Sequence, residues 1–391
     1  MLKILFLNYT YPFPEMGGTE RVIFNLTKYL GSNGIKSFIG FFEGVSGNIP
    51  HISGSVDLTN YTIAHYYLGD FIKKENISII ISFKKYFSRK ILKVIESSGC
   101  GYIASLRFRP VDHLEKVKLL SLKDYDKSSI KYILKCIFKS LYFEYVKIIT
   151  RSRIKRIFKV ADRYVLLSDK YRDSFCRING IKNQNEKIVS ISNALSFNES
   201  ISSAEIFKKE KKVLIVSRMM EKSKRIFLAL DIWNEFIKDT RYNDWGLIIV
   251  GDGIDLPRYK KYVKEIGIAN VSFEGRRDPY SYYKSSSIFL MTSSGEGFPM
   301  TLIEAQQLGC IPIAFNNYES LNDIIEHGYN GFIIDNNNKM EFIQNLKNLA
   351  ENNDMRIEFA QNAIKSCEKF SIDIIGERWL NLINDVWHER N

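Results

Sequence analysis

Short apolar runs that alternate with helix-length segments constrain the fold of this chain more than any other feature. In the second half these runs lie at residues 211–217, 245–253, 270–275, 287–292, 310–315 and 331–335. Segments with helical periodicity separate them, at 225–238, 256–266, 280–285 and near 319–326. Strands and helices in this order predict a doubly wound α/β domain, in which ligands bind at the carboxyl ends of the strands.

The first half shows the same alternation, with apolar runs at residues 2–7, 36–42, 78–83, 101–106 and 163–167. A chain of 391 residues is too long for one ordinary core. A polar stretch at 196–210 precedes a new strand and is a natural boundary. We therefore expect an N-terminal domain over residues 1–200 and a C-terminal domain over residues 201–370.

The chain is basic, with a formal net charge of +12 and a pI of about 9.2, which favours polyanionic partners. Residues 127–161 contain ten Lys or Arg and one acid, Glu144. Apolar residues recur there at helical spacing: Ile130, Leu134, Ile137, Leu141, Tyr145 and Ile148. The segment fits either a solvated surface helix or a helix lying on an anionic membrane. No nucleic-acid motif accompanies the charge, so we expect no nucleic-acid partner.

The five cysteines are odd in number and widely spaced, and no CxxC occurs. This pattern argues against a disulfide framework and against a zinc site, and it favours a reducing compartment. The N-terminal sequence lacks the features of a signal peptide, and no run approaches the ~20 apolar residues that span a bilayer. We expect a chain that is neither exported nor membrane-spanning.

Two loops that follow predicted strands could bind an anion. Gly17 and Gly18 lie between a strand and a helix, where backbone N–H groups can approach a phosphate, although a glycine pair also suits a simple turn. Arg218, Lys222 and Lys224 follow the strand at 211–217. Cations at that end of a strand suit a phosphate, and a solvated basic loop is the alternative.

The stretch from Ser293 to Phe315 contains two glutamates, Glu296 and Glu304. Thr301 and Glu304 have the spacing of a capping box, which would explain Glu304 structurally. No such need explains Glu296, which precedes the helix beside Gly297. Phe298 can pack under a ligand, and Pro299 has no N–H group. Met300 and Thr301 offer free helix-end amides to a ligand.

Together these motifs resemble those of the retaining glycosyltransferases of family 4. The resemblance rests on Glu-x7-Glu from Glu296 to Pro312, GGTER from Gly17 to Arg21, and SRMMEKSKR from Ser217 to Arg225. SNAL at 192–195 resembles the segment before the domain crossover. FSIDIIGERWLNLINDVW at 370–387 resembles a terminal helix that packs back on the first domain.

The resemblance implies the GT-B fold, with two facing Rossmann-like domains and a C-terminal helix over residues 371–391. Arg218, Lys224 and Glu296 would serve catalysis, and Glu304 would bind the nucleotide ribose. The expected donor-binding residues are Gly17, Gly18, Arg218, Lys222, Lys224, Gly297, Phe298, Pro299, Met300, Thr301 and Glu304. Family members commonly carry a histidine where this chain has Arg107, to which we assign an acceptor-side or donor-sugar role.

The implied activity is retaining transfer of a sugar from a nucleotide-diphosphate donor, UDP-linked, to a glycan. A lipid-linked polysaccharide intermediate at the cytoplasmic face of the cell membrane is the expected acceptor, with residues 127–161 on the membrane. No metal or other cofactor is expected, and the formal DxD of Asp124–Asp126 is interpreted as chance. A nucleotide-sugar epimerase of the same fold and a non-catalytic basic membrane or nucleic-acid binding protein are the alternatives.

Overall fold

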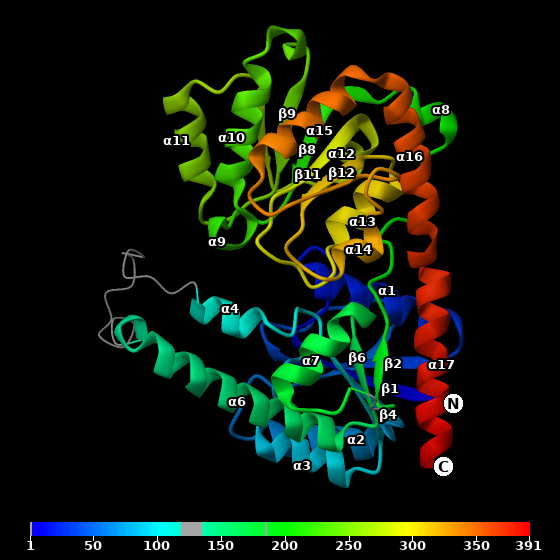
Figure 1. Cartoon of the computed structure of the whole chain (residues 1–391). Coiled ribbons are helices and arrows are strands. Elements are labelled where there is room, and N and C mark those ends of the chain that lie inside the picture. The colour runs from blue at the N-terminus through cyan, green and yellow to red at the C-terminus, as the bar shows by residue number, and fades with distance from the viewer. Residues whose placement is uncertain (1, 119–134, 184–185) are drawn as a thin grey trace. The chain divides into compact units, whose positions relative to one another are not determined.

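The computed structural model describes residues 2–118, 135–183 and 186–391, which form two compact units (Figure 1). The first unit comprises Met1–Ala194 and Ile372–Asn391, and the second comprises Leu195–Ser371. The chain passes from one unit to the next at Ala194 and returns at Ile372, beside the sequence-based limits of residues 200 and 370. The terminal helix therefore belongs to the first unit.

The first unit is built on a seven-stranded parallel sheet with the order β3-β2-β1-β4-β5-β6-β7. The strands are β1 (Lys3–Thr10), β2 (Lys36–Glu43), β3 (Ile52–Asp57), β4 (Ile79–Ser82), β5 (Gly101–Ser105), β6 (Arg163–Leu166) and β7 (Ile188–Ser190). The order reverses between β1 and β4, so the loops that follow these two strands diverge. Such a switch point is the usual ligand position in a doubly wound sheet.

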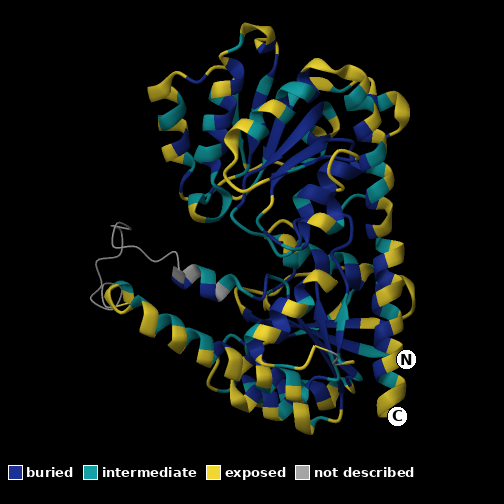
Figure 2. Ribbon diagram, viewed as in Figure 1, coloured by how far each residue is buried: buried dark blue, intermediate teal, exposed yellow. Residues whose placement is uncertain are grey.

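Helices cover this sheet, and the strands between them are buried (Figure 2). They are α1 (Gly18–Ser32), α2 (Ala64–Glu75), α3 (Arg89–Ser97), α4 (Asp112–Lys118), α6 (Lys139–Val160), α7 (Arg172–Asn179) and α17 (Ile372–Arg390). Central strand residues such as Phe6, Ile80 and Ile103 are fully buried. Runs of β-branched and aromatic residues suit a sheet that is covered on both faces.

The second unit has a six-stranded parallel sheet with the order β10-β9-β8-β11-β12-β13. The strands are β8 (Glu210–Val216), β9 (Gly246–Val250), β10 (Val271–Gly275), β11 (Ser286–Met291), β12 (Ile311–Phe315) and β13 (Phe332–Ile334). Its helices are α8 (Ser203–Ile206), α9 (Glu221–Lys224), α10 (Ile226–Ile237), α11 (Leu256–Ile266), α12 (Tyr280–Ser285), α13 (Met300–Gln307), α14 (Leu321–Ile324), α15 (Lys339–Glu351) and α16 (Asn353–Cys367). The strand order reverses between β8 and β11.

Helix α17 completes the core of the first unit. Gly376 lets it approach α1 closely, because a Cβ there would lie 2.5 Å from the ring of Tyr29. Trp379 is 1% exposed, and its ring centroid lies 5.9 Å from that of Phe83, just after β4.

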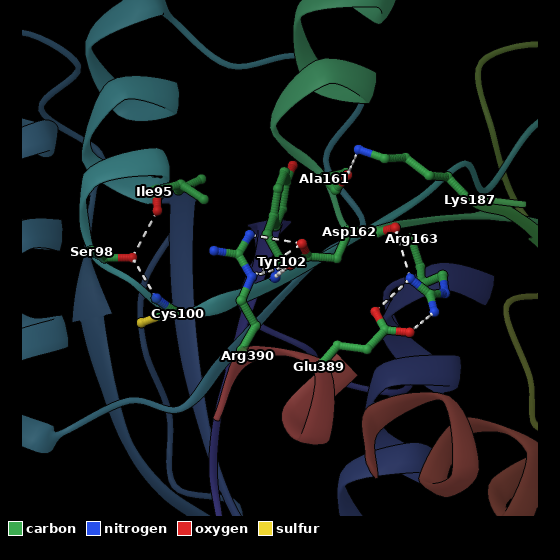
Figure 3. A network of polar contacts seen from close by, with 10 residues as sticks. All are labelled: Ile95, Ser98, Cys100, Tyr102, Ala161, Asp162, Arg163, Lys187, Glu389 and Arg390. Atoms are coloured by element: carbon green, nitrogen blue, oxygen red, sulfur yellow. Dashed lines mark hydrogen bonds and ion pairs between the residues drawn. The ribbon is translucent and has the colours of Figure 1, made fainter. Parts of the chain in front are cut away.

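The end of α17 is fixed by ion pairs, which Figure 3 shows. Arg390 donates to Asp162 at 2.7 Å, and Glu389 accepts from Arg163. Asp162 also accepts from the backbone N–H of Tyr102 in β5. The C-terminus is thereby tied to the middle of the sheet.

Two doubly wound α/β domains and a C-terminal helix were predicted, and the structure confirms this fold class. The prediction missed β3 and β7. The sequence of β3, ISGSVD, has Gly and Ser where a strand usually carries large side chains, and β7 has only three residues. Both strands lie at sheet edges, where little burial is needed.

Candidate active site

The switch point of the second unit brings two of the predicted motifs together. Strands β8 and β11 pair in parallel, so the loops that follow them leave the same edge of the sheet. The first loop contains Arg218 and continues through α9, and the second runs from Thr292 to Pro299. Residues some seventy positions apart in the sequence thus become neighbours.

Hydrogen bonds join these two loops. The Thr292 hydroxyl donates to the carbonyl of Lys224 at 2.8 Å, and the Ser294 N–H donates to the carbonyl of Ser223 at 2.8 Å. Arg225 adopts a left-handed conformation with φ 50° and donates to the carbonyl of Thr292 at 2.5 Å. Burial lowers the pKa of this guanidinium. The pair of loops is therefore a single preorganised framework.

Lys224 and Glu296 form an ion pair across this framework, with 2.5 Å between Nζ and the carboxylate. The side chains are 24% and 17% exposed, so both remain accessible. Arg218 and Lys222 are exposed on the same loop. The structure therefore gathers the predicted cations Arg218, Lys222 and Lys224 and the carboxylate of Glu296 at the carboxyl edge of the sheet.

A glycine turn supports the loop after β8. Gly251 and Gly253 have φ values of +136° and +157°. A Cβ on Gly251 would lie 1.8 Å from the carbonyl oxygen of Ser217, and one on Gly253 would lie 2.4 Å from that of Met219. Met219 N–H donates to the carbonyl of Asp252 at 2.9 Å. Only glycine allows this close approach, so the turn positions the basic loop.

The capping-box prediction is wrong. Helix α13 begins at Met300 with Pro299 at its N-cap, and no side chain caps it. Thr301 lies inside the first turn, two residues after the cap position. Because Pro299 carries no side-chain acceptor, the N–H groups of Met300 and Thr301 make no hydrogen bond among the described residues. These two donors lie just after Glu296, Gly297 and Phe298.

Glu304 is instead a buried carboxylate, 1% exposed. It accepts a hydrogen bond from the Ser196 hydroxyl at 2.5 Å and another from the Tyr283 hydroxyl at 3.2 Å. These partners come from the segment that enters the second unit and from α12. A carboxylate offers about four acceptor positions, so Glu304 can accept further hydrogen bonds.

The glycine loop of the first unit follows β1 and precedes α1. Gly17 is the N-cap residue and Gly18, exposed, is the first helical residue. Glu20 accepts hydrogen bonds from Asn8 at 3.3 Å and Thr10 at 2.8 Å, which fixes the helix start against the end of β1. A side chain at Gly17 would lie 2.7 Å from the Glu20 carboxylate.

Arg107 lies just after β5 in the first unit. It donates hydrogen bonds to Asn193 and to the Ser105 hydroxyl at 3.5 Å, and its guanidinium lies 5.0 Å from the centroid of Phe83. Burial lowers its pKa to about 9, so it remains a cation at neutral pH. These contacts hold the side chain in one orientation.

Sequence reasoning missed Ser196, Tyr283 and Arg225. Ser196 and Tyr283 show no pattern near Glu304, since they lie 108 and 21 residues away from it. Arg225 was visible only as the end of a basic stretch. Its left-handed backbone and its contacts with the loop after β11 depend on the fold.

The model of the family "Glycosyl transferases group 1" matches residues 196–366, which is nearly the whole second unit. Glu296, Glu304 and the basic loop all fall within the match. The sequence of the second unit is therefore similar to that of the glycosyl transferases of group 1.

Relatives extend this similarity along the chain. An uncharacterized glycosyltransferase of Haemophilus influenzae is 26% identical over 376 residues, which cover 94% of this chain and 96% of that protein. A Campylobacter jejuni relative is 28% identical over 195 residues, or 50% of this chain and 54% of that protein. It is named a GalNAc-alpha-(1->4)-GalNAc-alpha-(1->3)-diNAcBac-PP-undecaprenol alpha-1,4-N-acetyl-D-galactosaminyltransferase.

The fold is also that of solved structures. HepE of Anabaena, in a crystal structure with UDP and glucose, superposes with a TM-score of 0.71 at 17% identity, covering 98% of this chain and all of that one. The two Rossmann-like domains and C-terminal helix of this chain are those of the GT-B fold.

Two properties bear on cofactors and membranes. Among the described residues, no three His, Cys, Asp or Glu side chains lie together as a metal site would require. Asp124 and Asp126 lie outside the described residues. No helix that the structure describes combines the length and apolar character of a membrane span.

Proposed function

We propose that this chain is a retaining glycosyltransferase of family 4 that transfers a sugar from a nucleotide-diphosphate donor to a glycan acceptor. The observation that carries the proposal is the arrangement around the Lys224–Glu296 ion pair, with Arg218 and Lys222 on the same loop and free amides at Met300 and Thr301. These groups carry the charges and hydrogen-bond donors that would stabilise the charges created by glycosyl transfer.

Glycosyl transfer develops positive charge on the sugar ring and negative charge on the leaving diphosphate. Arg218, Lys222 and Lys224 would stabilise the diphosphate, assisted by the helix-end amides. When the donor binds, we propose that Lys224 leaves its ion pair with Glu296 and pairs with the diphosphate. The carboxylate of Glu296 then faces the donor sugar. The leaving phosphate would accept the acceptor's proton during attack on the same face, which retains the configuration.

UDP is the proposed nucleotide and a lipid-linked surface polysaccharide intermediate the proposed acceptor. HepE, of the same fold, was crystallised with UDP, and the Campylobacter relative is named for an undecaprenol-linked substrate. We also propose that Gly17 and Gly18 bind the donor phosphate. Arg107 is proposed to act near the donor sugar or the acceptor.

Donor binding can be tested by thermal shift with UDP, ADP and GDP, because a ligand of the native state raises its stability. UDP should give the largest shift. Replacing Arg218 or Lys224 with alanine should weaken UDP binding about tenfold or more, since each removes a charge-assisted contact. Lys260→Ala, an exposed lysine on α11, is the matched control.

Two results would contradict the proposal. Unchanged UDP affinity in both Arg218→Ala and Lys224→Ala would remove the donor site from this loop. Conversion of the donor sugar to an epimer, with the protein and donor alone, would indicate an epimerase.

We also propose that the chain acts at the cytoplasmic face of the cell membrane through α6 and the residues before it. Figure 2 shows that much of α6 is exposed. Five apolar side chains of this segment are each 54–71% exposed: Ile137, Phe138, Leu141, Tyr145 and Ile148. Lys139 and Lys147 accompany them. Exposed apolar side chains beside lysines match the chemistry of an anionic bilayer surface. The predicted contributions of residues 119–134 lie outside the described residues.

Vesicle flotation tests this membrane contact. The protein should float with vesicles that contain anionic lipid, and less so as salt is raised. Leu141→Asp with Ile148→Asp should abolish flotation, whereas Met340→Asp, an exposed apolar residue on α15, should not. Equal flotation of both proteins would refute the assignment to α6.

Transfer is proposed to need no metal, because cations and amides of the chain meet the leaving diphosphate. Activity should therefore persist in EDTA. Loss of activity in EDTA, with recovery on adding Mg²⁺ or Mn²⁺, would contradict this part of the proposal.

A further inference from the structure

The switch point of the first unit contains two buried lysines. Lys84 and Lys85 follow β4, the strand at which the order of the sheet reverses. They are 7% and 8% exposed. Lysine is rarely buried in this way, because removing an ammonium group from water is costly unless it is paired.

Aromatic rings surround the ammonium group of Lys84. Its Nζ lies 3.7 Å from the ring centroid of Phe42, 4.5 Å from that of Tyr9 and 4.8 Å from that of Tyr61. The Tyr61 hydroxyl accepts a hydrogen bond from it at 3.2 Å. These three rings form an aromatic cage, which attracts a cation but cannot neutralise it.

Two further cations lie against rings nearby. Lys85 Nζ is 3.9 Å from the ring centroid of Phe108 and 5.2 Å from that of Tyr86. The guanidinium of Arg153, on α6, lies 5.3 Å from the centroid of the same Tyr86 ring. Lys84, Lys85 and Arg153 form what we call the basic cluster.

The protein neutralises another buried cation of the same unit. Arg109, 5% exposed, forms ion pairs with Asp112 and Glu115. Lys84 forms no ion pair with any described residue. The acid that acts on it electrostatically is Glu43, at the exposed end of β2, which makes no contact within ion-pair distance. The fold therefore holds Lys84 in place while leaving its charge available.

Solvent borders the aromatic cage on one side. Tyr9 is 39% exposed and Tyr61 is 56% exposed, so a ligand can approach the cage from the side that these two rings form. Exposed tyrosine rings suit the faces of sugars, and an ammonium group behind them suits a phosphate. The combination matches a glycan that carries a phosphate group.

We propose that the basic cluster binds the phosphate or diphosphate of the acceptor, with Lys84 and Lys85 as its main ligands. This inference rests on the proposed transferase function and adds the residues that bind the phosphate of the acceptor. All of its residues belong to the first unit.

The titration of Lys84 agrees with this assignment. Burial lowers its pKa from 10.5 to about 8, and Glu43 opposes the shift. Tyr9 and Tyr61, which also face the ammonium group, have raised pKa values and stay neutral at that pH. A bound anion would raise the pKa of Lys84, so binding should weaken as pH rises above about 8.

Calorimetric titration of the full chain with inorganic pyrophosphate, in saturating UDP, tests the site while the donor position is filled. Lys84→Met and Lys85→Met should each weaken pyrophosphate binding about tenfold or more. Lys93→Met, an exposed lysine on α3, is the control and should bind like the unmodified protein. Unchanged binding in both cluster variants would overturn the inference.

A second titration, with geranyl diphosphate, distinguishes the sources of the phosphate. Tighter binding than pyrophosphate would support a lipid-linked acceptor, and equal binding would support recognition of the phosphate group alone. Either result supports the proposal only if Lys84→Met weakens the binding of that ligand. The UDP thermal shift of each variant separates a failure of the acceptor site from a failure of the proposed transferase function. A normal UDP shift with unchanged pyrophosphate binding would mean that only the acceptor site is wrong.

Discussion

At the scale of single residues, Glu304 shows how the fold changes the meaning of a sequence pattern. Its spacing from Thr301 suggested a helix cap, but its carboxylate is buried between the hydroxyls of Ser196 and Tyr283. We propose that the same carboxylate also accepts hydrogen bonds from the ribose of the donor. Stability and ligand binding can therefore be separated by choosing which partner to remove.

We expect Tyr283→Phe to destabilise the protein without changing its UDP affinity. The variant removes one donor to a buried carboxylate, which costs about 1–3 kcal/mol. Glu304→Gln should instead weaken UDP binding, because ribose hydroxyls donate best to a charged acceptor. Urea unfolding and UDP titration of both variants measure the two effects. Equal UDP affinities in the two variants would remove Glu304 from the ribose site.

Lys84 gives a second residue-scale prediction, on pH and stability. Its pKa is lowered to about 8 in the folded state, so between about 8 and 10.5 the unfolded chain holds more protons. Stability contributed at this site therefore rises with pH in that window and is lowest below it. The shift corresponds to about 3 kcal/mol at most.

Lys84→Met should therefore raise the free energy of unfolding at pH 7, with a gain that shrinks as pH approaches 10. Urea unfolding at pH 7, 8 and 9 measures this gain. Lys93→Met should show no such trend. A lower stability of Lys84→Met at pH 7 would mean that the aromatic cage stabilises the ammonium group more than burial destabilises it.

At the scale of elements, the glycine turn after β9 positions the basic loop after β8. We expect Gly251→Ala to displace that loop, because its Cβ would meet the Ser217 carbonyl at 1.8 Å and its φ is +136°. The variant should lose stability and UDP affinity together.

Gly267→Ala is the matched control. Gly267 also has a positive φ, +72°, but no atom lies within 4 Å of an added Cβ. It should cost about 1 kcal/mol from backbone strain alone and leave UDP binding intact. Thermal unfolding with and without UDP distinguishes the two variants. Normal UDP binding by Gly251→Ala would show that the loop does not depend on the turn.

At the scale of the whole molecule, the chain returns to the first unit through α17. Ile375, Trp379, Ile383 and Val386 are each 3% exposed or less in that unit. Residues 1–194 alone should therefore fail to fold cooperatively, because this apolar surface would be missing. Residues 195–371 should fold alone and retain a UDP thermal shift.

Circular dichroism and thermal shift of the two fragments test this prediction. Adding residues 372–391 to the first fragment as a peptide should restore folding. A cooperative transition in residues 1–194 without the peptide would contradict the assignment of α17 to the core of the first unit.

The sequence alone determined the two doubly wound domains, the terminal helix and most strands, because buried parallel strands are short apolar runs that glycine and polar loops separate. It also located the motifs at strand ends, where parallel topology brings loops together. Only the tertiary structure decided the partners of particular side chains: Glu296 with Lys224, Glu304 with Ser196, and Lys84 with its aromatic cage. Such contacts join distant parts of the chain and leave no periodic trace in the sequence.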